Sequence, residues 1–167
     1  GATGEELVRW QGGTIADDVI AARRAFDLLA DDDRVDADQL GLVGWSMGGR
    51  LAALVAGVDD RVRATVLMSA GAAPVDAYVA GAPTELQGVV REVLEPIDPL
   101  TRIDDAKGEV LVQAGRRDSI VPRAALDAVI AAAPKGTKVE WYPTDHALND
   151  QAQTDRIDWL SGELGLG

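Results

Sequence analysis

The sequence predicts an α/β fold in three layers, in which a mainly parallel sheet lies between helices. Short aliphatic runs alternate with amphipathic segments along the 167 residues. The runs lack the strict apolar–polar alternation of a one-sided sheet, which is typical of strands buried on both faces. Strands that alternate with helices pair in parallel, and the helices cover both faces. No repeat or low-complexity linker interrupts the pattern, so we expect a single domain over residues 1–167.

The predicted elements follow one another along the chain. Four aliphatic runs predict strands over residues 40–44, 64–69, 109–114 and 138–142. Apolar periodicity predicts helices over residues 14–30, 47–57, 85–94, 123–133 and 149–164. Thr14 is placed to cap the first of these helices and Pro122 to begin the fourth. In the last helix the expected inward residues are Ala152, Ile157, Trp159 and Leu160.

The net charge of −12 argues against two classes of partner. An acidic surface repels phosphate backbones and anionic lipid headgroups, so we expect neither nucleic acid nor a membrane as partner. The absence of cysteine excludes disulfides and thiolate chemistry. No apolar run reaches the roughly 18 residues of a membrane span. No leader-like segment opens the sequence, so we expect a cytoplasmic protein, with secretion left open if the natural N-terminus precedes Gly1.

A G-x-S-x-G motif, Gly44-Trp45-Ser46-Met47-Gly48, follows the first predicted strand and opens the next helix. This setting is typical of a nucleophile elbow, where a sharp turn exposes a serine at the carboxyl edge of the sheet. A strained serine needs neighbours without bulk two positions away, which the two glycines supply. The helix N-terminus favours negative charge, so the Met47 N–H is the predicted oxyanion donor. Ser46 is therefore the candidate nucleophile.

A serine hydroxyl needs a base, and the one histidine of the chain, His146, follows the last predicted strand. The imidazole in turn needs a carboxylate to orient it. Asp118, after the third predicted strand, is the preferred acid. Asp145 is a weaker alternative, because adjacent side chains in an extended loop usually point apart. Asp76, after the second predicted strand, is weaker still.

The order Ser46, Asp118, His146 is the chain order of α/β-hydrolases. The sequence resembles the C-terminal two-thirds of a hydrolase of the dienelactone-hydrolase or prolyl-oligopeptidase-like type. Residues 35–49 are similar to the family's helix–strand–elbow segment, residues 112–122 to its acid loop, and residues 142–146 to its histidine loop. The resemblance implies a reduced α/β-hydrolase fold, an acyl-enzyme formed by a Ser-His-Asp triad, and no metal or organic cofactor.

The sequence also departs from this family. Counterparts of its first four strands are missing, so the chain is expected to be truncated at the N-terminus relative to the family. The loop that gives the second oxyanion N–H is missing too, and Gly12-Gly13 does not replace it, because this pair precedes a helix. Strand 40–44, central in the family's sheet, becomes an edge. Apolar edges tend to pair with other chains, so we expect a homo-oligomer joined near this strand.

The sequence therefore predicts a carboxylesterase-like serine hydrolase that acts on a small-molecule ester. Trp45 and the stretch 71–96 are expected to shape the acyl pocket, although Trp45 fits buried packing equally well. Two alternatives stay open. One is a peptidase or amidase with the same triad, and the other is a catalytically silent hydrolase-like module used for interaction.

Overall fold

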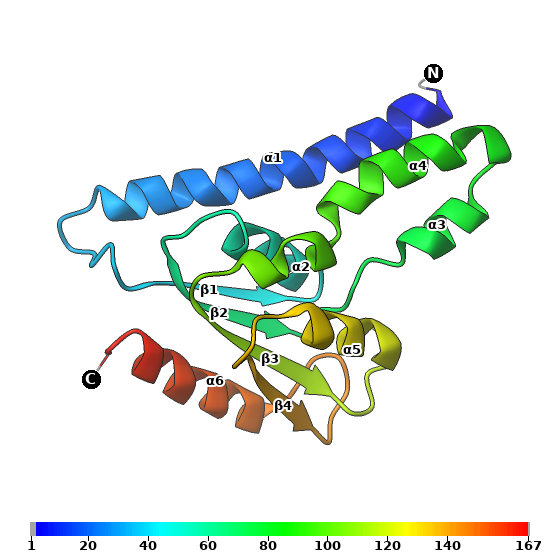
Figure 1. The fold of residues 1–167 in the computed structure, drawn as a ribbon. Coiled ribbons are helices and arrows are strands. Elements are labelled where there is room, and N and C mark those ends of the chain that lie inside the picture. Colours follow the sequence, from blue (N-terminus) through cyan, green and yellow to red (C-terminus); the bar gives the residue numbers. More distant parts are fainter. Residues whose placement is uncertain (1–2, 167) are drawn as a thin grey trace.

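Four strands form one sheet in the order β1-β2-β3-β4, and every neighbouring pair is parallel. The computed structural model describes residues 3–166 (Figure 1). The strands are β1 (Leu40–Trp45), β2 (Val62–Met68), β3 (Glu109–Gly115) and β4 (Lys138–Tyr142). The four predicted strands are thus confirmed to within two residues at each end.

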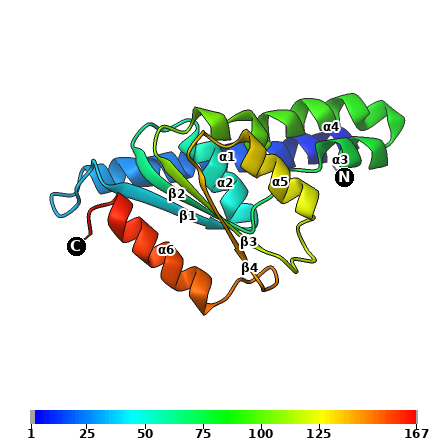
Figure 2. The same cartoon turned by 60° about the horizontal axis from the view of Figure 1, so that its bottom comes forward.

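Helices cover both faces of the sheet, as predicted. The helices are α1 (Gly4–Ala30), α2 (Met47–Ala56), α3 (Val75–Gly81), α4 (Gln87–Leu94), α5 (Arg123–Ala132) and α6 (Asp150–Glu163). Figure 2 shows α1, α2 and α5 on one face and α6 on the other. Helix α4 runs beside the N-terminal half of α1, and α3 packs against α4, away from the sheet (Figure 1). None of the helices within residues 3–166 has the length and apolar character needed to cross a bilayer.

Helix α1 begins ten residues earlier than the sequence indicates. Thr3 is its N-cap, and a capping box joins the Thr3 hydroxyl and N–H to Glu6. The predicted cap at Thr14 is wrong, because the Thr14 hydroxyl donates to the Trp10 carbonyl inside the helix, at 2.9 Å. Gly12 is also inside α1. A Cβ there would lie 2.0 Å from Val93 Cγ1, so the missing side chain lets α1 and α4 pack closely.

The main core lies between the sheet and helices α2 and α5. It joins Ala52 and Ala53 of α2 and Val129 of α5 to buried side chains of the strands. A second cluster packs α1 on the sheet through Phe26, Leu40, Val55 and Val62. On the opposite face, Ala152 of α6 is fully buried, as predicted, whereas Ile157 is 52% exposed. The prediction that Ile157 points inward is wrong, because five residues of α-helix separate it from the buried Ala152 and place it on a different side of α6.

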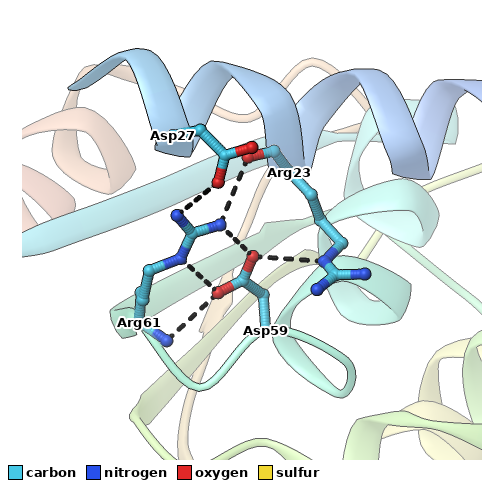
Figure 3. Close-up of polar contacts among 4 residues, drawn as sticks. All are labelled: Arg23, Asp27, Asp59 and Arg61. Atoms are coloured by element: carbon cyan, nitrogen blue, oxygen red, sulfur yellow. Dashed lines mark hydrogen bonds and ion pairs between the residues drawn. The ribbon is translucent and has the colours of Figure 1, made fainter. Parts of the chain in front are cut away.

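A group of four charged residues ties α1 to the turn before β2 (Figure 3). The buried Asp59 accepts two side-chain hydrogen bonds from Arg61, at 2.8 and 2.6 Å, and one from Arg23, at 3.3 Å. Arg61 also donates to Asp27 of α1, at 2.7 Å. The bonds from Arg61 lower the pKa of Asp59 to about 2, although burial opposes this shift. The carboxylate therefore stays charged and holds the helix in register with the sheet.

Candidate active site

Ser46 occupies a sharp turn between the end of β1 and the start of α2. Its backbone has φ 54° and ψ −116°, a conformation that costs free energy for any residue with a Cβ. The Ser46 N–H donates to the Met68 carbonyl at the end of β2, at 2.8 Å, and the Gly49 N–H donates to the Ser46 carbonyl, at 3.0 Å. These bonds stabilise the strained turn. The strand, tight turn and helix that the motif predicts are therefore present in this order.

Two glycines make the turn sterically possible. A Cβ on Gly44 would lie 2.1 Å from the Gly48 carbonyl oxygen, and one on Gly49 would lie 2.5 Å from Ala70 Cβ. A Cβ on Gly48 would meet no atom within 4 Å. The expectation that both motif glycines are needed for space is thus wrong for Gly48, since the second close approach belongs to Gly49. The helix backbone turns Gly48 outward, which the motif alone does not reveal.

His146 and Asp118 form a direct pair at the carboxyl edge of the sheet. His146 Nδ1 lies 2.8 Å from Asp118 Oδ2, and the two side chains are 14% and 1% exposed. The other carboxylate oxygen accepts the backbone N–H groups of Ile120 and Val121, both at 2.9 Å. Burial by itself raises the pKa of Asp118. The bonds from Val121, His146 and Ile120 outweigh burial and hold this pKa below its usual value, so the carboxylate is charged.

Backbone contacts between two loops bring this pair together. Beyond the strand ends, the Arg116 N–H donates to the Tyr142 carbonyl, at 2.8 Å, and the Arg117 N–H donates to the Thr144 carbonyl, at 2.9 Å. A Cβ on Gly115 would lie 2.2 Å from the Asp145 carbonyl oxygen, so only glycine allows this approach. The parallel pairing of β3 and β4 thus continues into the acid and histidine loops.

The histidine loop is also attached to the elbow. The Trp45 indole N–H donates to the His146 carbonyl at 3.0 Å, and the Trp45 and His146 ring centroids are 5.2 Å apart. Because Trp45 directly precedes Ser46, these contacts bring the imidazole beside the elbow. The indole is half-exposed and has a structural contact, so its predicted role in substrate binding stays a prediction.

Sequence reasoning missed a second anchor of the histidine loop, Ser69. This serine is fully buried, has φ 48°, and its hydroxyl donates to the His146 carbonyl at 2.9 Å. Its N–H donates to the Gln113 carbonyl at 2.8 Å. A serine directly after a buried strand, at the edge where the other site residues gather, is the signal that could have found it.

The two alternative acids lie in other environments. Asp145 Oδ1 accepts the Ala147 N–H of its own loop, at 3.1 Å. Asp76 lies on α3, its side chain is 90% exposed, and it pairs with Arg91 at 2.8 Å. The carboxylate that meets the imidazole is therefore that of Asp118, the preferred candidate from the sequence.

Met47 is the first residue of α2, so its N–H has no acceptor within the helix. Within residues 3–166, no strand precedes β1, so the family loop that gives a second oxyanion donor has no counterpart there.

Among the same residues, no three His, Asp or Glu side chains gather closely enough to hold a metal ion. Beside Met47 and Gly48, a cavity of about 500 Å³ extends between α1, α2 and the segment 73–97.

Comparisons with known proteins agree with this fold. The acetyl xylan esterase 1 of a Thermoanaerobacterium species is 20% identical, with a TM-score of 0.72 over 85% of this chain and 51% of that protein. The acetyl xylan esterase of a Paenibacillus species is 18% identical, with a TM-score of 0.73 over 84% of this chain and 50% of that one. The dipeptidyl peptidase 4 of Porphyromonas gingivalis is 19% identical, with a TM-score of 0.66 over 91% of this chain and 23% of that one.

The chain spans about half the length of the two esterases. A comparison with curated protein sequences finds no match. The model of the dienelactone hydrolase family matches residues 3–159, which include the elbow and the acid and histidine loops. The chain therefore belongs to the dienelactone hydrolase family, within the α/β-hydrolase superfamily.

Proposed function

We propose that this chain carries the catalytic centre of a serine hydrolase that cleaves carboxylic esters. The observation that carries the proposal is the 2.8 Å pair between His146 and a buried, charged Asp118, attached through Trp45 to the strained elbow of Ser46. Family membership supports a hydrolase of this kind. Strained backbone beside an oriented imidazole is costly to maintain, which supports a catalytic role over a structural one.

Each side chain has a defined part in this mechanism. With its proton on Nδ1, His146 donates to Asp118, which leaves Nε2 free to accept the Ser46 proton. The Ser46 oxygen attacks the ester carbonyl, and the Met47 N–H stabilises the oxyanion at the N-terminus of α2. His146 then protonates the leaving alcohol. The same imidazole then takes a proton from water, which attacks the acyl-enzyme, and returns this proton to the Ser46 oxygen as the carboxylic acid leaves.

The nucleophile is tested with p-nitrophenyl acetate. Replacing Ser46 with alanine removes the attacking atom, so we expect kcat to fall by roughly 10³-fold or more, to the solution background. Ser161→Ala is the matched control, because Ser161 belongs to α6, which covers the face of the sheet opposite α2 (Figure 2). If Ser46→Ala and Ser161→Ala hydrolyse the ester at the same rate as the unchanged chain, the proposal is wrong.

The acid and base are tested separately from the nucleophile. Asp118→Asn keeps the shape of the side chain but favours the wrong imidazole tautomer, so we expect a loss of about 10⁴-fold in kcat. Asp145→Asn is the matched control, since Asp145 bonds to its own loop. A serine-directed fluorophosphonate should label the unchanged chain through Ser46 and label His146→Ala far more slowly. Equal labelling rates would exclude His146 as the base.

Amide hydrolysis is the second candidate, because the structural similarity extends to a protein named dipeptidyl peptidase 4. The same serine attack cleaves an amide, so p-nitroanilides of short peptides compared with p-nitrophenyl esters distinguish the two activities. A chain that turns over neither substrate above the Ser46→Ala background would instead be a silent interaction module.

A further inference from the structure

The cavity of about 500 Å³ beside the elbow has one wall on α2, beginning at the two residues that follow Ser46. Met47 and Gly48 line it at the N-terminus of α2, and Leu51 and Leu54 line it further along. Its size lies within the range of about 300–1,000 Å³ that is typical of small-molecule sites. The cavity therefore begins at the residue bonded to Ser46, although the Ser46 side chain itself is not part of its lining.

The opposite walls come from parts of the chain that the sequence motifs do not mark. Trp10 and Ile15 contribute from the N-terminal half of α1, and Tyr78, Leu94 and Ile97 contribute from the segment that carries α3 and α4. This arrangement depends on the close packing of α1 against α4 at Gly12, where no Cβ is tolerated. The long α1 is thus a wall of the cavity as well as a cover of the sheet.

The lining favours an apolar occupant. Of its polar side chains, Thr14 donates to the Trp10 carbonyl and Arg50 donates through Nε to the Gly71 carbonyl, so both the hydroxyl and Nε already have acceptors. Tyr78 adds one hydroxyl to an otherwise mainly apolar lining. Asp18 is exposed on α1. A sugar needs several convergent donors and acceptors, whereas an alkyl or aryl group needs only apolar walls.

The depth of the cavity limits the size of this group. Met47 and Leu54 are seven residues apart on α2, and at about 1.5 Å per residue the wall between them is about 10 Å long. With C–C bonds of about 1.5 Å at tetrahedral angles, a zigzag chain advances about 1.25 Å per carbon. About eight carbons therefore fill the cavity from the elbow to Leu54.

We propose that this cavity binds the acyl group of the substrate, and that the substrates are esters of medium-length apolar acids with about eight carbons. The proposal rests on the serine-esterase function proposed above. It makes Ile15 and Trp10, on a helix far from the motifs, residues that determine specificity.

The test compares p-nitrophenyl acetate, butyrate, octanoate and laurate. Each buried methylene contributes about fourfold in kcat/KM. Octanoate has six more methylenes than acetate. If half of them are buried, kcat/KM rises about 60-fold. We expect kcat/KM to rise to octanoate and then level off or fall at laurate. Ile15→Trp fills the cavity and should lower the octanoate-to-acetate ratio at least tenfold. Ile20→Trp, on the same helix and outside the lining, should leave the ratio unchanged.

A binding measurement separates the cavity from the chemistry. In the Ser46→Ala background, 8-bromooctanol should quench tryptophan fluorescence saturably, because Trp10 lines the cavity that it enters, and Trp10→Phe should remove most of this quenching. Saturable quenching without hydrolysis of any ester would support the apolar site and overturn the proposed esterase. Ser46-dependent hydrolysis with no chain-length preference, and no quenching through Trp10, would overturn the acyl site and leave the esterase standing.

Discussion

Replacing Asp59 with asparagine should destabilise the fold through the loss of one buried charge. The Asp59 side chain is 4% exposed and binds Arg61 and Arg23 (Figure 3). Asparagine has nearly the same shape but no charge, and its amide N–H₂ group cannot accept a bond from a guanidinium. Arg61 keeps its bond to Asp27, so the substitution isolates the contribution of the Asp59 carboxylate.

The size of the effect follows from the pKa. Asp59 has a pKa of about 2 in the folded chain and an ordinary value of 3.8. Because one pKa unit is about 1.4 kcal/mol, this difference stabilises the fold by roughly 2 kcal/mol at pH 7. The folded pKa lies below the unfolded one, so the stabilisation is complete above about pH 5. It is lost as the pH falls through the folded value, and roughly half of it remains at pH 3.

Urea unfolding at pH 7 and pH 3 measures this difference. We expect Asp59→Asn to lower the free energy of unfolding by roughly 2 kcal/mol at pH 7, which lowers Tm by about 4–8 °C. At pH 3 the penalty should fall to about half. Asp60→Asn is the matched control, since Asp60 is the exposed neighbour in the same turn. The reasoning is refuted if Asp59→Asn and Asp60→Asn unfold alike at pH 7, or if the penalty is the same at both pH values.

Three further predictions concern the elbow, the histidine loop and the sheet edge. Gly44→Ala should unfold the elbow or cost several kcal/mol in a melting experiment, because its Cβ would lie 2.1 Å from the Gly48 carbonyl oxygen, whereas Gly48→Ala should be tolerated. Ser69→Ala removes the bond to the His146 carbonyl and should lower the free energy of unfolding by about 1 kcal/mol. It should raise the activation free energy for hydrolysis of p-nitrophenyl acetate by more than this, which is measured as a fall in kcat. The edge of β1 should pair two copies, so sedimentation should show a dimer at micromolar concentration, and a stable monomer would contradict this.

The agreement between sequence and structure is closest where the signals are local. Aliphatic runs and their spacing predict all four strands. The expected burial on both faces holds for β2 and β3, whereas β1 and β4 are edge strands and are partly exposed. The elbow is equally local, since the strained Ser46 and the glycine at Gly44 lie within one turn. The earlier start of α1 is hidden because Gly12-Gly13 weakens the helical pattern. Packing against α4 explains the glycine at Gly12, whereas a Cβ on Gly13 would meet no atom within 4 Å.

The sequence by itself determined the fold class, the nucleophile motif and the identity of the single imidazole, because each is a property of residue type and short-range order. Only the tertiary structure decided which carboxylate meets His146, that Ser69 and Trp45 hold the histidine loop, and that α1 and α4 enclose a cavity beside Ser46. These are contacts between residues tens of positions apart. They depend on strand order, on close approaches at Gly115 and Gly12, and on helix length, none of which a local pattern specifies.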